Sequence, residues 1–207
     1  MRIFDHLALD FPEKEIFLRL GGHCVKTALD DQSKHHFMQI SRRAFELCLP
    51  QGRWMMLKIN SASADGVDTE KGVLPLGKVF MQKWNNAAFL WCGAVTIGNA
   101  LTAARDNLER VSESAVYDAV GSECADRAMD NLFSLSSSEL LRQALVLSPH
   151  RFSPGYGDMP LELQKFLFHT LDMEQMGVVL NEHNYLIPEK SVTAFAFINT
   201  LQGNIVS

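Results

Sequence analysis

The stretch Ala87-Ala88-Phe89-Leu90-Trp91-Cys92-Gly93-Ala94-Val95-Thr96-Ile97 decides the fold, because it is mostly apolar and has the length of a single strand. A strand whose apolar residues do not alternate with polar ones is typical of the middle of a sheet, where both faces are covered. We therefore expect residues 87–97 to form a central strand.

Apolar residues at three- and four-residue spacing predict helices on both sides of this strand. The predicted helices cover residues 13–20, 33–49, 79–84, 99–110, 114–132 and 161–171. Extended patterns predict further strands over 54–59, 177–180 and 192–198, and turn residues predict a polar loop over 61–72. Helices and strands mixed in this way indicate an α+β fold, and the length suits one domain.

The helix predicted over 114–132 is the longest, and Gly121-Ser122-Glu123 interrupts its apolar stripe. A glycine inside a helix costs roughly 1 kcal/mol relative to alanine. We expect a close approach by backbone or by a ligand to explain this glycine.

The composition is that of an ordinary globular protein, with 47% hydrophobic and 21% charged residues among 207. The formal net charge of −5 gives no electrostatic basis for binding nucleic acid or an anionic membrane. The N-terminus lacks the pattern of a secretory signal, and the longest apolar run, residues 87–95, is too short to span a bilayer. We therefore expect a cytoplasmic protein whose partners are proteins or small molecules.

Signatures of common catalytic and metal sites are absent from the sequence. The four cysteines lie far apart without a C-x-x-C pair, so we expect reduced thiols and no metal site. Nucleotide-binding glycine motifs, H-E-x-x-H and G-x-S-x-G do not occur. His35-His36 on a helix and the Glu182-His183 pair both fit structural roles better than catalytic ones. We assign no catalytic residue.

A second segment carries chemistry that points to a ligand, and it reads Arg151-Phe152-Ser153-Pro154-Gly155-Tyr156-Gly157-Asp158-Met159-Pro160. A guanidinium pairs both oxygens of a carboxylate or phosphate, and glycine lets a ligand approach the main chain closely. The amides that begin the helix predicted over 161–171 would favour the same anion. The segment also fits an ordinary turn, in which Asp158 is the start signal of that helix.

An ordered set of residues continues from this loop to the end of the chain. It comprises Arg151-x-x-Pro154-Gly155-Tyr156, Pro160, Gly177-x-x-Leu180-x-Glu182, Pro188 and Ser191-Val192. This set resembles the C-terminal activation domain of cobalamin-dependent methionine synthase, which shows R-P-x-P-G-Y, a helix, a segment like I-G-x-x-L-T-E-S, then W-P-x-x-S-V and a strand. Residues 65–129 look like the shorter, free-standing relatives of that domain.

The resemblance implies a fold more specific than the α+β class. We expect a single domain over residues 1–207 with a twisted, mainly antiparallel central sheet flanked by helices. Within it, residues 1–60 would form a helical N-terminal part, and residues 61–207 the core that carries the ligand loop.

The resemblance also implies S-adenosylmethionine binding in a groove. Arg151 would hold the methionine carboxylate, the main chain of Phe152, Ser153, Pro154 and Gly155 would pack near the adenosine, and Tyr156 would shape the pocket. Glu123 would contact the ribose or the amino group, and Glu182 would support the loop from behind. Such a domain binds and orients the methyl donor, and it leaves the difficult chemistry to a cofactor.

That cofactor, cobalamin, would belong to a partner, because the chain lacks the D-x-H-x-x-G corrinoid-binding motif. We expect the partner to be a corrinoid-binding protein or a core methionine synthase, with a reductant of the flavodoxin or ferredoxin type. The protein would then act in trans, during the reductive methylation that reactivates a corrinoid methyltransferase.

Three departures from the family pattern accompany the matches. Ala196 stands at the position of a ligand-contacting tyrosine, Phe152 replaces the first proline of R-P-x-P-G-Y, and the family's N-terminal aspartate has no placed counterpart. An alternative is therefore a non-enzymatic partner subunit that keeps the fold and has lost the donor site. A third reading is an unrelated domain that binds a small molecule.

Overall fold

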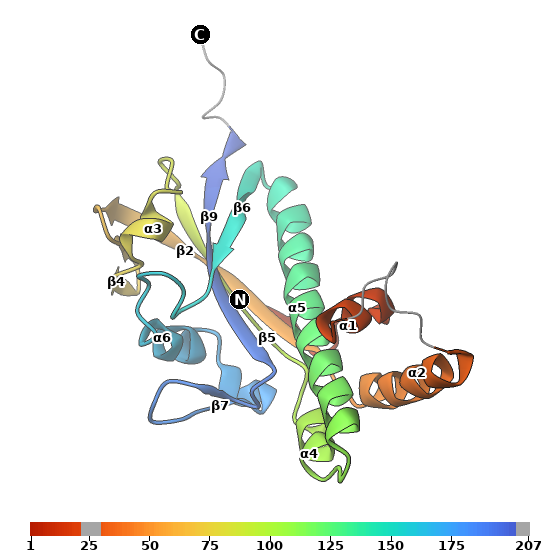
Figure 1. Ribbon diagram of the computed structural model, residues 1–207. Helices are drawn as coiled ribbons and strands as arrows, with labels where there is room; N and C mark the ends of the chain where they lie inside the picture. The colour runs from red at the N-terminus through yellow and green to blue at the C-terminus, as the bar shows by residue number, and fades with distance from the viewer. Residues whose placement is uncertain (22–29, 202–207) are drawn as a thin grey trace.

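The computed structural model describes residues 1–21 and 30–201 and has one large sheet at its centre (Figure 1). Seven antiparallel strands form this sheet in the order β4-β3-β2-β5-β9-β6, with β1 also paired to β2. The strands are β1 (Arg2–Phe4), β2 (Gln51–Ala62), β3 (Val67–Thr69), β4 (Gly72–Leu74), β5 (Phe89–Thr96), β6 (Leu145–Phe152) and β9 (Ser191–Thr200). A separate hairpin pairs β7 (Val179–Leu180) with β8 (Leu186–Ile187).

Helices cover both faces of the sheet. They are α1 (Glu13–Arg19), α2 (Asp31–Glu46), α3 (Lys78–Met81), α4 (Ala100–Asp106), α5 (Val111–Leu141), α6 (Leu163–Thr170) and the 3-10 helix η1 (Met173–Met176). The long helix α5 lies along one face, with α1 and α2 beyond it, and α3 and α6 lie across the other face (Figure 1). The predicted α+β fold, with a mainly antiparallel sheet flanked by helices, is confirmed.

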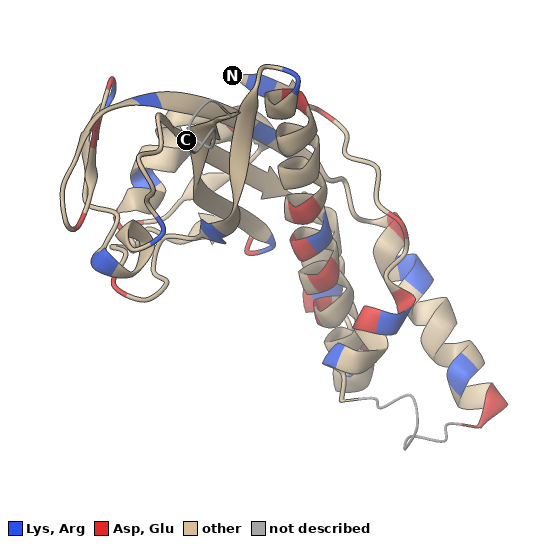
Figure 2. Cartoon of the chain, turned by 90° about the horizontal axis from the view of Figure 1, so that it is seen from above, with Lys and Arg blue, Asp and Glu red and all other residues tan. Residues whose placement is uncertain are grey.

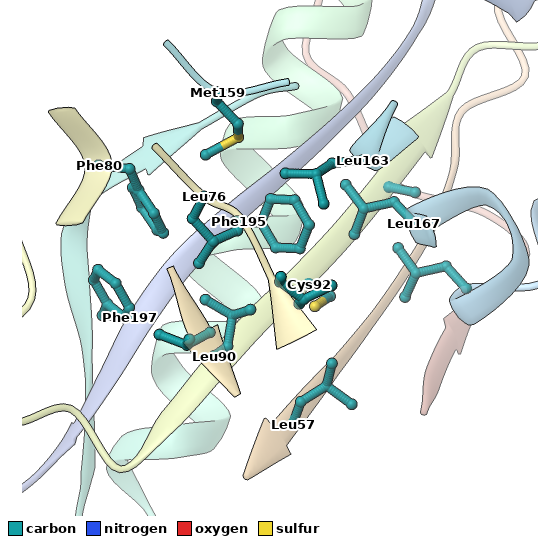
Figure 3. Packing of buried hydrophobic residues seen from close by; sticks show 14 of the residues in the cluster. Leu57, Leu76, Phe80, Leu90, Cys92, Met159, Leu163, Leu167, Phe195 and Phe197 are labelled. Atoms are coloured by element: carbon teal, nitrogen blue, oxygen red, sulfur yellow. The ribbon is translucent and has the colours of Figure 1, made fainter. Parts of the chain in front are cut away.

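The central strand is where the sequence predicts it. Its residues Leu90 to Thr96 are fully buried, because β2 and β9 flank β5 and helices cover both of its faces. On the α6 face, Phe80 of α3 stacks on Phe197 of β9 with ring centroids 4.4 Å apart (Figure 3). Buried apolar area of this kind stabilises the fold by about 25 cal/mol per Å².

Two extended segments differ from the prediction. Residues 67–74 lie in or beside the predicted polar loop, but they form the β3–β4 hairpin at one edge of the sheet. Residues 145–152 were not predicted as a strand, yet they form β6 at the opposite edge. Pro149 lies inside β6, and a proline is tolerated there because an edge strand leaves half of its backbone donors unpaired.

Helix α5 extends well beyond the predicted residues 114–132. Its second half contains Ser136-Ser137-Ser138, which by intrinsic propensity does not favour a helix. The buried Ser136 hydroxyl donates a hydrogen bond to the Leu132 carbonyl at 2.7 Å, and Leu140 is fully buried against the sheet. Packing against the core therefore overrides local propensity in this segment.

The division expected at residues 60 and 61 has no counterpart in the sheet. Strand β2 crosses that boundary, and its residues Gln51 to Lys58 pair with β5. The described part of the first 50 residues, 1–21 and 30–50, contributes the short β1 and the helices α1 and α2. Among the helices of residues 1–21 and 30–201, none combines the length and the hydropathy that crossing a membrane requires.

Candidate functional site

A bulge in β6 builds the site around Arg151. Leu147 pairs with Ile198 and Arg151 pairs with Ala196, so three residues of β6 lie opposite one residue of β9. Two of the three residues Ser148, Pro149 and His150 are therefore extra, and bulges of this kind bend a strand and are common next to functional sites. The arginine therefore lies within β6, in the short paired segment that follows the bulge, and not in a loop as predicted.

The Arg151 side chain lies on the face of the sheet that α5 covers. Its Nη2 donates a hydrogen bond to Asp130 Oδ1 of α5 at 2.6 Å. Its guanidinium carbon is 5.5 Å from the ring centroid of Phe133, one turn further along α5, at a distance typical of a cation–π contact. Two α5 side chains thus hold the arginine, whose side chain is 32% exposed.

A groove of about 430 Å³ opens beside this arginine. Its lining consists of Pro149, His150, Arg151, Phe152, Ser153 and Tyr156. The groove brings together four of the predicted site residues, and a volume of this order suits a small organic ligand. Pro149 and His150 were missed by sequence reasoning, because the bulge that turns them into the groove has no signature other than the proline itself.

The loop after β6 is a turn closed by backbone hydrogen bonds. Gly155 has φ +85, a conformation that favours glycine, and its N–H donates to the Met159 carbonyl at 3.1 Å. Tyr156 is exposed, and its ring meets the ring of Phe152 edge to face at 5.5 Å. Pro154 is buried beneath them. The loop therefore presents one exposed aromatic ring next to the groove.

The alternative reading, in which Asp158 is the start signal of the helix that follows it, is wrong. Its carboxylate instead accepts hydrogen bonds from the backbone N–H groups of Lys78 at 2.7 Å and Val79 at 3.1 Å. These groups begin α3, where Gly77 offers no capping side chain. The ligand loop is thus anchored to a helix some eighty residues upstream, a contact that local sequence does not reveal.

The start of α6 is not an anion site. The N–H groups of Leu163, Gln164 and Lys165 already donate to the carbonyls of Pro160, Leu161 and Glu162 at 2.9–3.3 Å. None of these residues lines the groove. The prediction that α6 amides would bind the same anion as Arg151 is therefore wrong.

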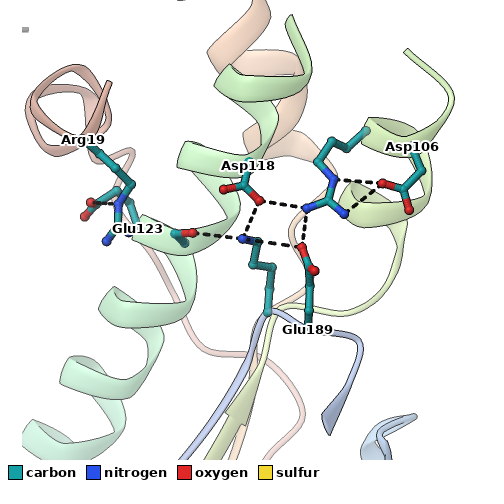
Figure 4. Close-up of polar contacts among 8 residues, drawn as sticks. Arg19, Asp106, Asp118, Glu123 and Glu189 are labelled. Atoms are coloured by element: carbon teal, nitrogen blue, oxygen red, sulfur yellow. Dashed lines mark hydrogen bonds and ion pairs between the residues drawn. The ribbon is translucent and has the colours of Figure 1, made fainter. Parts of the chain in front are cut away.

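The two carboxylates predicted for the site lie away from the groove. Glu123 is on α5, where its Oε1 accepts a hydrogen bond from Arg19 Nε of α1 at 2.5 Å (Figure 4). Glu182 is in the turn between β7 and β8, 86% exposed, with its Oε1 3.5 Å from His183 Nε2. Neither residue is part of the groove lining.

At Ala196, the position that matches the family's tyrosine, the neighbouring Trp91 side chain occupies the face of the sheet. Ala196 is fully buried and lies opposite both Arg151 on β6 and Trp91 on β5. The Trp91 ring lies over Gly93, where an added Cβ would come within 2.0 Å of it, and meets Phe133 edge to face at 5.1 Å. The small residue at 196 thus lies beside a large indole ring that occupies the same face.

The interruption of α5 at Gly121 has a packing explanation. A Cβ at this position would lie 2.9 Å from Leu101 of α4 and 3.2 Å from the Lys190 side chain. Lys190 Nζ then reaches Asp118 Oδ1 at 2.7 Å and Ser122 Oγ at 3.0 Å (Figure 4). The close approach is therefore made by the side chains of Leu101 and Lys190, and not by backbone or by a ligand as expected.

Asp118 is shared by two cations. Arg105 Nη1 donates to it at 2.8 Å, beside the hydrogen bond from Lys190. Partial burial disfavours the Asp118 charge, but Lys190 and Arg105 outweigh this effect and lower the pKa of the carboxyl. The cluster joins α4, α5 and the start of β9, and its charges are paired with one another.

Metal chemistry has no support in the described parts of the chain. His, Cys, Asp and Glu side chains of residues 1–21 and 30–201 form no group of three that could hold a metal ion. Cys24 lies outside the described residues. Cys48, Cys92 and Cys124 are free thiols.

Comparison with known proteins gives a structural match and no match by sequence. No protein-family model and no curated protein matches the chain. A crystal structure of the MetH reactivation domain bound to AdoHcy superposes with a TM-score of 0.59, at 16% identity, over 92% of this chain and 70% of that chain. The chain has the fold of the MetH reactivation domain. The expected structural relationship to the MetH reactivation domain is confirmed.

Proposed function

We propose that the groove at Arg151 binds S-adenosylmethionine or its demethylated product AdoHcy, and that the protein presents the methyl donor to a corrinoid methyltransferase in trans. The observation that carries the proposal is the place of Arg151, at a bulge that opens a groove of about 430 Å³. Support also comes from the fold, which is that of a domain crystallised with AdoHcy.

The residues of the groove fit the amino-acid end and the apolar body of such a ligand. The Arg151 guanidinium would bind the carboxylate, because its fork matches the two oxygens. Phe152 and Tyr156 offer aromatic surface, and Ser153 offers a hydroxyl. The Pro154 ring fixes one φ of the turn and the Gly155 N–H is bonded to the Met159 carbonyl, so part of the ordering is in place before a ligand binds.

The protein's own contribution would be to bind the donor, orient its methyl group and exclude water. The corrinoid would be carried by a corrinoid-binding protein or a core methionine synthase, and would supply the methyl-accepting chemistry there. A flavodoxin or ferredoxin type of protein would supply the reductant. This scheme assigns no acid or base to the chain.

Isothermal titration calorimetry with AdoHcy and with S-adenosylmethionine tests the binding step. We expect Arg151→Ala to weaken either ligand by roughly 10- to 100-fold, the effect of removing a charged hydrogen-bond donor. Arg110→Ala is the matched control, because Arg110 pairs with Glu113 at the start of α5 and does not line the groove. An affinity that Arg151→Ala leaves unchanged would refute the site.

The second candidate is a partner subunit that keeps the fold without the donor site. Ala196 favours it, because the face that it shares with Arg151 is occupied by Trp91. Co-purification with a corrinoid protein, together with no heat of AdoHcy binding at millimolar ligand, would support this candidate over the first.

A further inference from the structure

The guanidinium that would bind a ligand anion is already paired within the protein. Asp130 Oδ1 lies 2.6 Å from Arg151 Nη2, and Phe133 lies next to the same guanidinium. Both residues belong to α5. We propose that Asp130 is an intramolecular competitor for Arg151, which an anionic ligand must displace before it binds in the groove. This inference rests on the proposed function only in taking the groove as the anion site.

The geometry separates the ion pair from the groove. Arg151 lines the groove, whereas neither Asp130 nor Phe133 does. The pair therefore holds the guanidinium toward α5 instead of toward the residues after β6. Asp130 is 60% exposed and Arg151 is 32% exposed, so an anion that approaches from solvent meets the carboxylate together with the cation.

The charges along α5 strengthen the competition (Figure 2). Glu123, Asp126 and Asp130 are spaced three and four residues apart and share one side of the helix. Arg19 pairs with the first two, and Arg151 pairs with the third. Arg127 of the same helix pairs with Glu15 of α1, so four carboxylates face three cations here, and the excess negative charge disfavours a ligand carboxylate.

The pKa of Asp126, in the middle of the row, is raised from its ordinary value. Partial burial is the main cause that raises this pKa, Arg19 lowers it, and the neighbouring Glu123 and Asp130 carboxylates each raise it by less than burial does. Asp130 is the member of the row that contacts Arg151.

The variant Asp130→Asn keeps the shape of the side chain and removes its charge. We expect it to bind AdoHcy roughly two- to fivefold more tightly than the natural protein, the range that a partly exposed ion pair supports. Asp126→Asn is the matched control. It removes one negative charge from the same helix, one turn before Asp130, but Asp126 pairs with Arg19 and not with Arg151. Where the natural protein binds AdoHcy, a calorimetric affinity that Asp130→Asn leaves equal or weaker would overturn the proposal.

A second measurement separates this inference from the proposed function. Phenylglyoxal modifies accessible guanidinium groups, and peptide mass spectrometry gives the rate at Arg151. We expect faster modification of Arg151 in Asp130→Asn than in the natural protein and in Asp126→Asn. Faster modification without AdoHcy binding to any variant would support the competitor and refute the ligand. Equal modification rates would overturn the competitor even where AdoHcy binds.

Discussion

Removing the Asp158 carboxylate tests whether the ligand loop depends on its anchor to α3. In Asp158→Ala, the N–H groups of Lys78 and Val79 lose their acceptor, and Gly77 has no side chain to replace it. Loss of one helix cap typically costs about 1 kcal/mol. Here one carboxylate accepts two bonds in an exposed setting, so we expect the free energy of unfolding to fall by about 1–2 kcal/mol.

For a chain of this length, such a loss corresponds to a decrease in Tm of roughly 2–8 °C. Differential scanning calorimetry and urea unfolding measure it, and Asp158→Asn is the graded control, because an amide oxygen keeps one acceptor without the charge. We expect the natural protein to have the highest Tm, Asp158→Asn an intermediate Tm and Asp158→Ala the lowest. We also expect weaker AdoHcy binding, because the loop holds Tyr156 beside the groove. Equal Tm values for all three proteins would refute the anchoring role.

Two further predictions concern groups with shifted pKa values. The pKa of Asp118 is lowered by Lys190 and Arg105, so its ion pairs stabilise the protein above about pH 4 and lose that effect as the pH falls through the lower folded-state pKa. Asp118→Asn should therefore reduce the free energy of unfolding at pH 7, by less than about 1 kcal/mol because Asp118 is half exposed. Urea unfolding near pH 2 should show no such reduction, and a reduction that persists there would show that it does not come from the ion pairs. Burial raises the pKa of the Cys92 thiol, and a hydrogen bond to Cys48 followed by burial raises that of Cys124. Iodoacetamide at pH 8 should alkylate neither thiol until urea is added, as measured by peptide mass spectrometry. Labelling of Cys92 in the folded protein would show that β5 opens.

The fold was predictable where one segment carries its own pattern. The unbroken apolar run of β5 indicated a central strand, and the spacing of apolar residues indicated α1, α2 and α5. Strand β6 was missed because its pairing partner, β9, lies far along the chain and Pro149 interrupts its pattern. The second half of α5 was missed because burial of Leu140, and not propensity, makes it helical.

The site was predictable only in its loop. Arg151, Phe152, Ser153 and Tyr156 were expected from the family resemblance, and the structure brings them to one groove. Asp130 and Phe133 could not be expected, since no sequence pattern links a helix residue to a strand that lies twenty residues away. Glu123 was placed on the correct helix, but its partner Arg19 comes from the N-terminal part of the chain.

The bulge in β6 has a consequence for how the molecules meet one another. Strand β6 is the outermost strand of the sheet, and a straight edge strand presents a row of backbone groups on which a second copy can continue the sheet. The bend at Ser148 and His150 breaks that row, and Pro149 removes one donor from it. The irregularity that opens the groove therefore also protects the protein from edge-to-edge aggregation.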